Sequence, residues 1–214
     1  MALKKGAAKK GFNPKTKQPI EIAASKAVYF KPALRSKKPL INKIMGKKSV
    51  YIETTIPSLV TARPSRDIKE LFRQEEAKYF WENERHKYDL YISKYVIEEC
   101  EKGDPDAAHR RLDLIKDIPH LPMTPETEEL AEEYFKFLDI PEKAKTDCFH
   151  LAVCVMNEID FLISWNMTHL GRPTYRKVVK FNDQRNLWLP ELLTPDVFME
   201  VMEKEKKEKQ NGKV

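Results

Sequence analysis

The chain has 214 residues and a net charge of +6, and this length suits one well-packed domain with a tail. No apolar run reaches the roughly 18 residues of a membrane-spanning helix, and the N-terminal lysines are not followed by the apolar stretch of a secretory signal. These features exclude an integral membrane protein and favour a cytoplasmic one. The three cysteines, Cys100, Cys148 and Cys154, fit no metal-binding spacing and are expected to be reduced core residues.

Charge is distributed unevenly along the chain. Residues 1–49 carry 14 Lys or Arg and one acid, a net charge of +13, whereas the remainder carries 25 basic and 32 acidic side chains, a net charge of −7. A basic segment joined to an acidic domain indicates two functions, with the basic segment as the part that binds polyanions. We therefore expect a flexible basic tail at 1–48, a folded domain at 49–202 and a charged C-terminal tail at 203–214.

The basic tail contains a turn followed by a strand-like stretch. Asn13-Pro14 with Lys15 and Lys17 indicates the turn, and Ile20 and Ile22 alternate with polar residues as in an exposed ribbon. Continued through Ala24, Lys26 and Phe30-Lys31, this order resembles the DNA-gripping arm of the HU/IHF family of histone-like proteins. In that family the proline of the arm wedges between base pairs in the minor groove. The DNA contacts that the resemblance implies here are Pro14, Lys15, Lys17 and Lys26.

The tail departs from that family in one respect. The family builds its body from N-terminal helices and a dimeric sheet, and neither precedes Gly11. Because an arm alone cannot bury a core, the segment is either a flexible polycation or a shape-specific grip on DNA. A further alternative is that the natural product starts at Met45, where the folded domain is expected to begin.

From residue 49 onward, short β-branched and aromatic runs alternate with helical patterns. Helix-start signals occur at Ser65, expected as an N-cap, and at Asp104-Pro105, Thr124-Pro125 and Pro141-Glu142, the last opening a helix to about Glu158. The expected strands are 50–52, 89–93, 120–123, 160–164 and 192–194. This alternation predicts an α/β fold, a three-layer α/β/α sandwich around a central, mainly parallel sheet.

Oxygen-bearing side chains occur where these strands end or the neighbouring helices begin. Glu53 follows the first strand, Glu98 and Glu99 lie early in the helix after the second, Asp147 lies near the start of a helix, and Asn166 follows strand 160–164. Ligands bind at the carboxyl edge of open α/β sheets, so these oxygens are expected to meet there. Such a set favours Mg²⁺ or Mn²⁺, ions that assist phosphodiester hydrolysis. Taken singly, each acid is also explained as a solvated helix residue or a charge at a helix N-terminus.

The order of these acids resembles the PIN domain family, which includes the toxins of VapBC-type toxin–antitoxin pairs. The motifs that carry the resemblance are Glu53-Thr54-Thr55, Glu99 to Gly103, Ala144 to Asp147, and Ser164-Trp165-Asn166. It covers about residues 49–200. It implies a metal-dependent ribonuclease in which Glu53, Glu99, Asp147 and Asn166 are the catalytic metal ligands. Glu53 and Asn166 replace aspartates of the family, and metal affinity is expected to fall because one carboxylate is displaced by a methylene and one charge is lost.

Several neighbouring residues have two interpretations each. Thr54 and Ser164 either orient the acids or cap helices. His150 shares a helix face with Asp147 but is expected as a core or surface residue before a ligand. Trp165 either packs against the domain or stacks on a base.

The function expected from the sequence is a PIN-type endoribonuclease that uses Mg²⁺ or Mn²⁺, the toxin of a toxin–antitoxin pair. Its expected partners are an RNA substrate, a cognate antitoxin and a second copy of the chain, with DNA as a partner of the tail. Arg172 and Arg176 belong to a basic cluster that either holds a phosphate backbone or faces solvent. The alternative is a catalytically weak PIN-like module that the basic tail recruits to nucleic acid.

Overall fold

The computed structural model of the protein describes residues 9–12, 19–22, 47–166 and 172–211. The chain separates into two units, Met1–Lys37 and Lys38–Val214. In the first, strand β1 (Lys9–Phe12) pairs antiparallel with β2 (Pro19–Ile22). The strand predicted at Ile20 and Ile22 is confirmed, while Pro14, Lys15, Lys17 and Lys26 lie outside the described residues.

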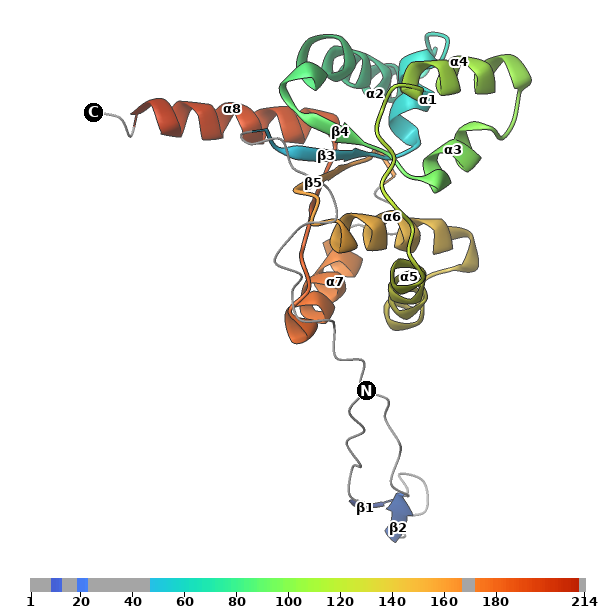
Figure 1. Cartoon of the computed structure of the whole chain (residues 1–214), viewed down its shortest axis with the longest axis vertical. Helices are drawn as coiled ribbons and strands as arrows, with labels where there is room; N and C mark the ends of the chain where they lie inside the picture. The colour runs from blue at the N-terminus through green and yellow to red at the C-terminus, as the bar shows by residue number, and fades with distance from the viewer. Residues whose placement is uncertain (1–8, 13–18, 23–46, 167–171, 212–214) are drawn as a thin grey trace. The chain divides into compact units, whose positions relative to one another are not determined.

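The second unit is built on a parallel sheet (Figure 1) with the strand order β4-β3-β5-β6. The strands are β3 (Ser49–Ile52), β4 (Asp89–Tyr91), β5 (Phe161–Ile163) and β6 (Glu191–Leu193). Each neighbouring pair in this order runs parallel. The predicted α/β class, with a mainly parallel sheet flanked by helices, is confirmed for the part of the chain that the structure describes.

Strand β3 is buried on both faces because strands flank it on both edges and helices cover it above and below. Val50, Tyr51 and Ile52 are each 0% exposed, as expected for the continuous apolar run of a parallel sheet. At its start, the amide and hydroxyl of Ser49 both donate to Oδ2 of Asp160, at 2.8 and 2.9 Å. This contact joins the amino ends of β3 and β5, two strands whose opposite, carboxyl ends are followed by Glu53 and Ser164.

Helices lie on both sides of this sheet (Figure 1). On one side are α1 (Thr55–Thr61), α2 (Ile68–Tyr79), α3 (Lys94–Cys100) and α4 (Pro105–Ile115). On the other are α5 (Pro125–Leu138), α6 (Lys145–Met156) and α7 (Arg172–Arg185). The C-terminal helix α8 (Pro195–Asn211) packs near α2. Three short helical segments are η1 (Phe80–Glu84), η2 (Arg85–Lys87) and η3 (Glu142–Ala144).

Two of the predicted helix starts are confirmed in detail. Asp104 accepts a hydrogen bond from the amide of Ala107 at 2.9 Å, and Thr124 accepts one from the amide of Thr127 at 3.3 Å. Each cap is followed by a proline at the first helical position, where its missing N–H costs no hydrogen bond. The predicted start at Pro141-Glu142 is the short segment η3, which leads directly into α6.

The N-cap predicted at Ser65 was wrong by two residues. Asp67 caps α2 instead, because its Oδ1 accepts from the amides of Lys69 and Glu70 at 2.9 and 3.0 Å. Ser65 serves the preceding loop, where its amide donates to the buried Gln74 at 2.9 Å.

The strand predicted at 120–123 was also wrong. His120 forms only an isolated parallel bridge with Ile92. Pro119 and Pro122 flank this bridge, and proline cannot donate to a sheet ladder, so pairing stops after one residue.

Three helices differ from the sequence analysis. The sequence analysis predicted no helix directly after Glu53, yet α1 begins two residues later, at Thr55. Pro57 lies within the first turn of α1, where proline is tolerated. α7 contains the cluster of Arg172 and Arg176 but was not predicted as a helix. α8 continues to Asn211 and so crosses the boundary expected at 202/203.

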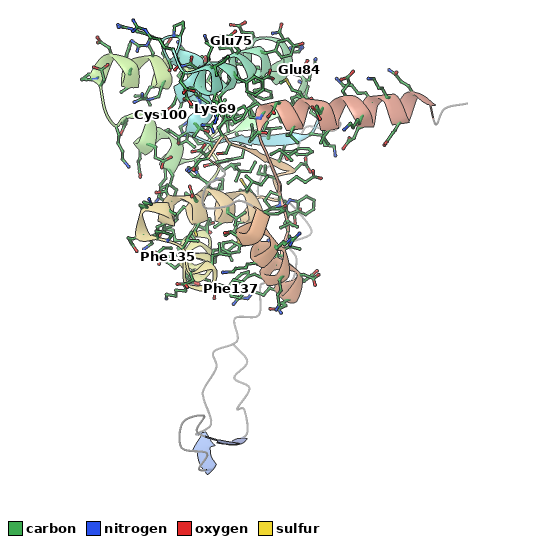
Figure 2. All side chains as sticks on the ribbon, turned by 180° about the vertical axis from the view of Figure 1, so that it is seen from behind. Lys69, Glu75, Glu84, Cys100, Phe135 and Phe137 are labelled. Atoms are coloured by element: carbon green, nitrogen blue, oxygen red, sulfur yellow. The ribbon has the colours of Figure 1, made fainter. Side chains whose placement is uncertain are left out.

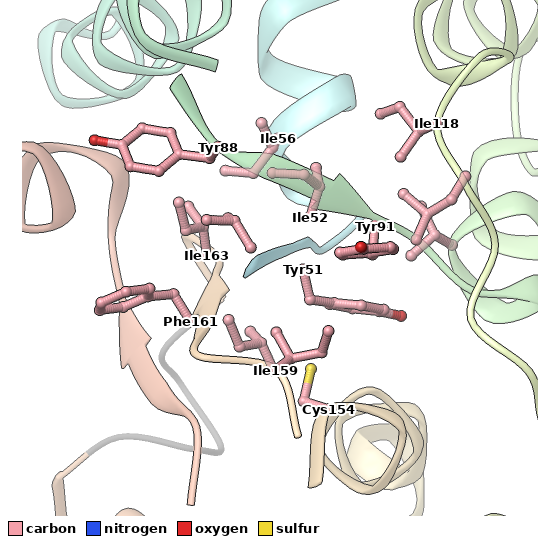
Figure 3. Packing of buried hydrophobic residues seen from close by; sticks show 14 of the residues in the cluster. Tyr51, Ile52, Ile56, Tyr88, Tyr91, Ile118, Cys154, Ile159, Phe161 and Ile163 are labelled. Atoms are coloured by element: carbon pink, nitrogen blue, oxygen red, sulfur yellow. The ribbon is translucent and has the colours of Figure 1, made fainter. Parts of the chain in front are cut away.

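Two apolar clusters hold the layers together. The first surrounds β3, and Figure 3 shows Tyr51 and Cys154 on one side of this strand and Ile52 with Ile56 on the other. The second joins α5, α6 and α7, and Figure 2 labels Phe135 of α5, which packs against it. All three cysteines are buried and unpaired, as predicted. Among the described residues no helix combines the length and apolarity needed to cross a membrane.

Candidate metal centre

Three ionisable side chains from three different elements meet at the carboxyl end of β3. Glu53 directly follows β3, Glu99 lies on α3, and His150 lies on α6. One carboxylate oxygen of each glutamate and one ring nitrogen of the histidine lie within 4.8 Å of one another. The carboxyl edge of the sheet, where the sequence predicted a ligand, is therefore where these groups gather.

Glu53 is buried and held by three donors. Its Oε2 accepts from the amide of Thr55 at 3.0 Å, from the hydroxyl of Thr55 at 2.6 Å and from the hydroxyl of Ser164 at 2.8 Å. Ser164 follows β5, so this carboxylate joins the ends of two neighbouring strands. Such bonds hold a buried carboxylate in one orientation.

Glu99 is held from two sides. Its Oε2 accepts a short hydrogen bond from the hydroxyl of Thr54 and lies 3.1 Å from Nε2 of His150. Burial works to raise the pKa of Glu99, but the hydrogen bond and positive charge of His150, with the Thr54 bond, lower this pKa below its usual value. Thr54 and Ser164 thus orient the acids, which was one of the two interpretations predicted for them.

Asp147 is buried and lacks a partner for one of its oxygens. Its Oδ2 has no hydrogen-bond partner among the described residues, while Oδ1 accepts from Nδ2 of Asn166 at 3.2 Å. Burial raises the pKa of Asp147 to about 6, and the charges of Glu53 and Glu99 act in the same direction. A buried oxygen without a partner is costly unless a proton or a cation binds it.

His150 is fully enclosed on α6, yet both of its ring nitrogens have polar contacts. Nδ1 lies 2.7 Å from the hydroxyl of Tyr51, which in turn lies 2.6 Å from the hydroxyl of Ser93. Burial opposes the charged imidazolium, but the bond to Glu99 and the neighbouring carboxylates raise the pKa of His150. The sequence placed His150 in the core or at the surface; it lies in the core and contacts a candidate ligand.

Glu53 and Glu99 line a cleft of about 540 Å³. The basic side chains of Arg73 and Lys102 and the ring of Trp165 line the same cleft. The guanidinium of Arg73 lies 5.7 Å from the centre of the Trp165 ring, so cation and aromatic face adjoin. The cleft therefore combines a place for a cation with positive charge and an aromatic surface at its rim.

The structure separates the predicted site residues into groups. Glu53 and Glu99 lie together, Asp147 interacts electrostatically with both, and Asn166 donates a hydrogen bond to Asp147. Of the adjacent pair on α3, Glu98 is exposed while Glu99 is partly buried and faces the cluster. Arg176 is exposed on α7, and the side chain of Arg172 lies outside the described part.

Sequence reasoning placed His150 on the helix face of Asp147 but predicted no contact between His150 and the other acids. It missed Arg73 and Lys102 altogether. Arg73 and Lys102 carried no comparable signal, because charged residues are common on exposed helices. Only the packing of α2 and α3 around the strand ends brings them to the cleft.

Comparison with known proteins gives a family match at one end of the chain. Residues 1–41 match the family described as Bacterial DNA-binding protein, as the HU/IHF resemblance predicted. None of the curated protein sequences matches the chain.

Two solved structures are similar to this chain. One is VapC20 of Mycobacterium tuberculosis, a Sarcin-Ricin loop cleaving toxin, with 18% identity and a TM-score of 0.43 over 56% of this chain and 92% of that one. The other is VapBC2 of Rickettsia felis, bound to a DNA fragment from its promoter, with 11% identity and a TM-score of 0.42 over 68% of this chain and 98% of that one.

Proposed function

We propose that the protein is a metal-dependent endoribonuclease of the PIN type. The observation that carries this proposal is the meeting of Glu53 and Glu99 with His150 at the carboxyl edge of a parallel sheet. The buried Asp147 lies near enough for its charge to interact with both glutamates, and one of its oxygens has no partner among the described residues. A cluster of like charges in a buried place is unfavourable by itself, since each carboxylate raises the cost of ionising its neighbours. A bound divalent cation removes this cost.

The donor set fits such an ion. Carboxylate oxygens are the usual ligands of Mg²⁺ and Mn²⁺, and the unpartnered oxygen of Asp147 offers a further one. Glu53, Glu99 and Asp147 would hold the ion, with Asn166 placed to fix Asp147. When bound, the ion supplies Lewis-acid activation of water and stabilises charge at phosphorus.

The remaining polar groups of the cleft have roles of their own. Thr54, Thr55 and Ser164 orient the carboxylates by donating to them. Arg73 and Lys102 line the cleft and are placed to contact phosphates of an RNA strand. Positioned donors and charges of this kind are the main protein contribution to phosphoryl chemistry.

The test is cleavage of a mixed RNA pool by the full-length protein with Mn²⁺, with Mg²⁺ or with EDTA. We expect cleavage with a metal and none with EDTA. Glu99→Gln should reduce the rate at least about 100-fold, since it removes a charged ligand without changing shape. Glu98→Gln, the exposed neighbour on the same helix, is the matched control and should retain the wild-type rate. Equal rates in EDTA, or equal loss in both variants, would contradict the proposal.

A second candidate function is nucleic-acid binding by the basic tail. It is supported by the match of residues 1–41 to bacterial DNA-binding proteins and by a net charge of +13 over residues 1–49. In this case the tail would bind nucleic acid and thereby recruit the folded domain to it.

Removal of residues 1–44 tests this candidate. We expect weaker binding to duplex DNA and a shallower salt dependence, because the slope of log K against log salt falls by about 0.9 for each phosphate that the protein no longer neutralises. Fluorescence anisotropy at several salt concentrations measures both, and Glu99→Gln in the full chain is the control that keeps the tail. Unchanged affinity and slope after the deletion would exclude the tail as the binding element.

By the PIN resemblance we further propose a cognate antitoxin and a homodimer. The acidic character of residues 50–214 is compatible with a basic partner. Light scattering of the purified chain, alone and with a candidate antitoxin, measures both assemblies.

A further inference from the structure

The buried imidazole of His150 is placed as part of the cluster. The side chain is 2% exposed, and its Nε2 lies 3.1 Å from Oε2 of Glu99. The ligand atoms of His150, Glu53 and Glu99 all lie within 4.8 Å of one another. Ligands on opposite sides of an ion with bonds of about 2.1 Å are about 4.2 Å apart, so small side-chain adjustments allow one ion to contact all three.

We propose that Nε2 of His150 is a metal ligand beside Glu53 and Glu99, so that the centre binds a first-row transition ion such as Mn²⁺ in preference to Mg²⁺. The inference rests on the proposed metal-dependent function and adds a nitrogen to a set expected to contain only oxygen. Imidazole is a good ligand for transition ions, whereas Mg²⁺ takes oxygen ligands and retains water.

The contacts behind His150 support this role. A histidine that binds metal usually donates its other ring N–H to a neighbouring group, which fixes the tautomer and the ring plane. Nδ1 of His150 has such a neighbour in the hydroxyl of Tyr51 at 2.7 Å, and that hydroxyl has its own partner in the hydroxyl of Ser93 at 2.6 Å. With Nδ1–H donating to Tyr51 and Tyr51 donating to Ser93, the lone pair of Nε2 is directed at the carboxylates and is available to an ion.

The same heavy atoms also satisfy the centre without metal. Ser93 can donate to Tyr51, Tyr51 to Nδ1, and Nε2–H to Glu99. For a neutral imidazole, the two arrangements contain the same number of protons and differ only in the direction of donation along the chain Ser93–Tyr51–His150. Metal loading then requires a change of tautomer at His150, whereas an imidazolium loses its Nε2 proton as the ion binds.

The competing role is that His150 only donates to Glu99 and never contacts the ion. Electron spin-echo modulation of the Mn²⁺-loaded full-length protein distinguishes the two, because it detects a directly bound ¹⁴N. We expect histidine nitrogen modulation in the wild type and its loss in His150→Gln. His109→Gln, on the exposed face of α4, is the folded control and should keep the signal.

Affinity gives a second readout. Calorimetric titration should show Mn²⁺ binding about 10- to 100-fold weaker in His150→Gln, and Mg²⁺ binding changed less. Tyr51→Phe, which removes only the hydroxyl, should keep the nitrogen signal and weaken Mn²⁺ binding by about 10-fold.

The outcomes separate this inference from the proposed function. Mn²⁺ bound without nitrogen modulation, in a protein that still cleaves RNA, would overturn the ligand role of His150 and leave the nuclease in place. A nitrogen signal that persists in His150→Gln would also overturn it. Absence of metal binding together with absence of cleavage would end both proposals.

Discussion

Asp147→Asn is expected to stabilise the metal-free protein at pH 8 while it removes metal-dependent cleavage. Asp147 has a pKa raised from 3.8 to about 6 in the folded chain. A shift of roughly 2 units is worth about 3 kcal/mol. Asparagine has nearly the same shape and carries no charge, so it relieves this cost and still accepts from Asn166.

The pH dependence follows from the sign of this shift. Because the folded pKa is raised, the stability associated with the neutral carboxyl is fully present below pH 3.8 and is lost as the pH rises through about 6. The stability difference between Asp147→Asn and the wild type should therefore be near zero at pH 3.5 and largest at pH 8. Urea unfolding in EDTA at both values measures this difference.

Asp183→Asn is the matched control, since Asp183 is exposed on α7. We expect it to change stability by less than about 0.5 kcal/mol and to leave cleavage unchanged. A loss of stability at pH 8 in Asp147→Asn would show that the ionised carboxylate stabilises the fold, contrary to the role assigned to it. A gain in stability together with a loss of cleavage in Asp147→Asn is the result expected when a residue serves catalysis at the expense of stability.

Phe198→Ala is expected to have the largest effect on stability. Phe198 is 0% exposed, and its ring contacts those of Phe80, Tyr88 and Phe161 at centroid distances of 5.9, 4.8 and 5.0 Å. Truncation of such a ring removes buried area and leaves a cavity, with a cost of about 3–5 kcal/mol. The midpoint of thermal unfolding should fall by about 10 °C.

The control for this variant is Val197→Ala, at the adjacent position of α8, where the side chain is 40% exposed. It should cost less than about 1 kcal/mol. Thermal unfolding followed by circular dichroism compares the two variants. If both have the same small effect, α8 does not belong to the folded core, and the domain ends before it.

Those parts of the fold that could be predicted from the sequence have a local signal. The apolar run Val50–Ile52 and the cap–proline pairs at Asp104 and Thr124 each depend on a few adjacent residues. α1 and the N-cap of α2 were missed because their residues have alternative local uses. Thr55 belongs to a helix whose first turn also binds Glu53, and Ser65 lies in the loop before α2, where its amide donates to Gln74 of that same helix.

The candidate site was predictable to a similar degree. Its acids follow from the rule that parallel strands end at one edge. Glu53 and Glu99 do lie together there, with Asp147 close enough for their charges to interact. The choice between Glu98 and Glu99 depends on the rotation of α3 against the sheet, which the sequence pattern does not specify. The contacts of His150 with Tyr51 and Glu99 join three separate elements, and no local pattern contains them.

The hydrogen bonds of the centre have a consequence for the lifetime of the folded chain. Thr54 and Glu99 are 45 residues apart, His150 and Glu99 are 51 apart, and Glu53 and Ser164 are 111 apart. Each contact closes a long loop, and such closures carry an entropic cost that local contacts avoid. An ion that binds only the closed arrangement stabilises all of them together, by about 2.7 kcal/mol at a concentration 100 times its Kd. The supply of metal would then regulate how long the protein survives proteolysis, in addition to whether it cleaves RNA.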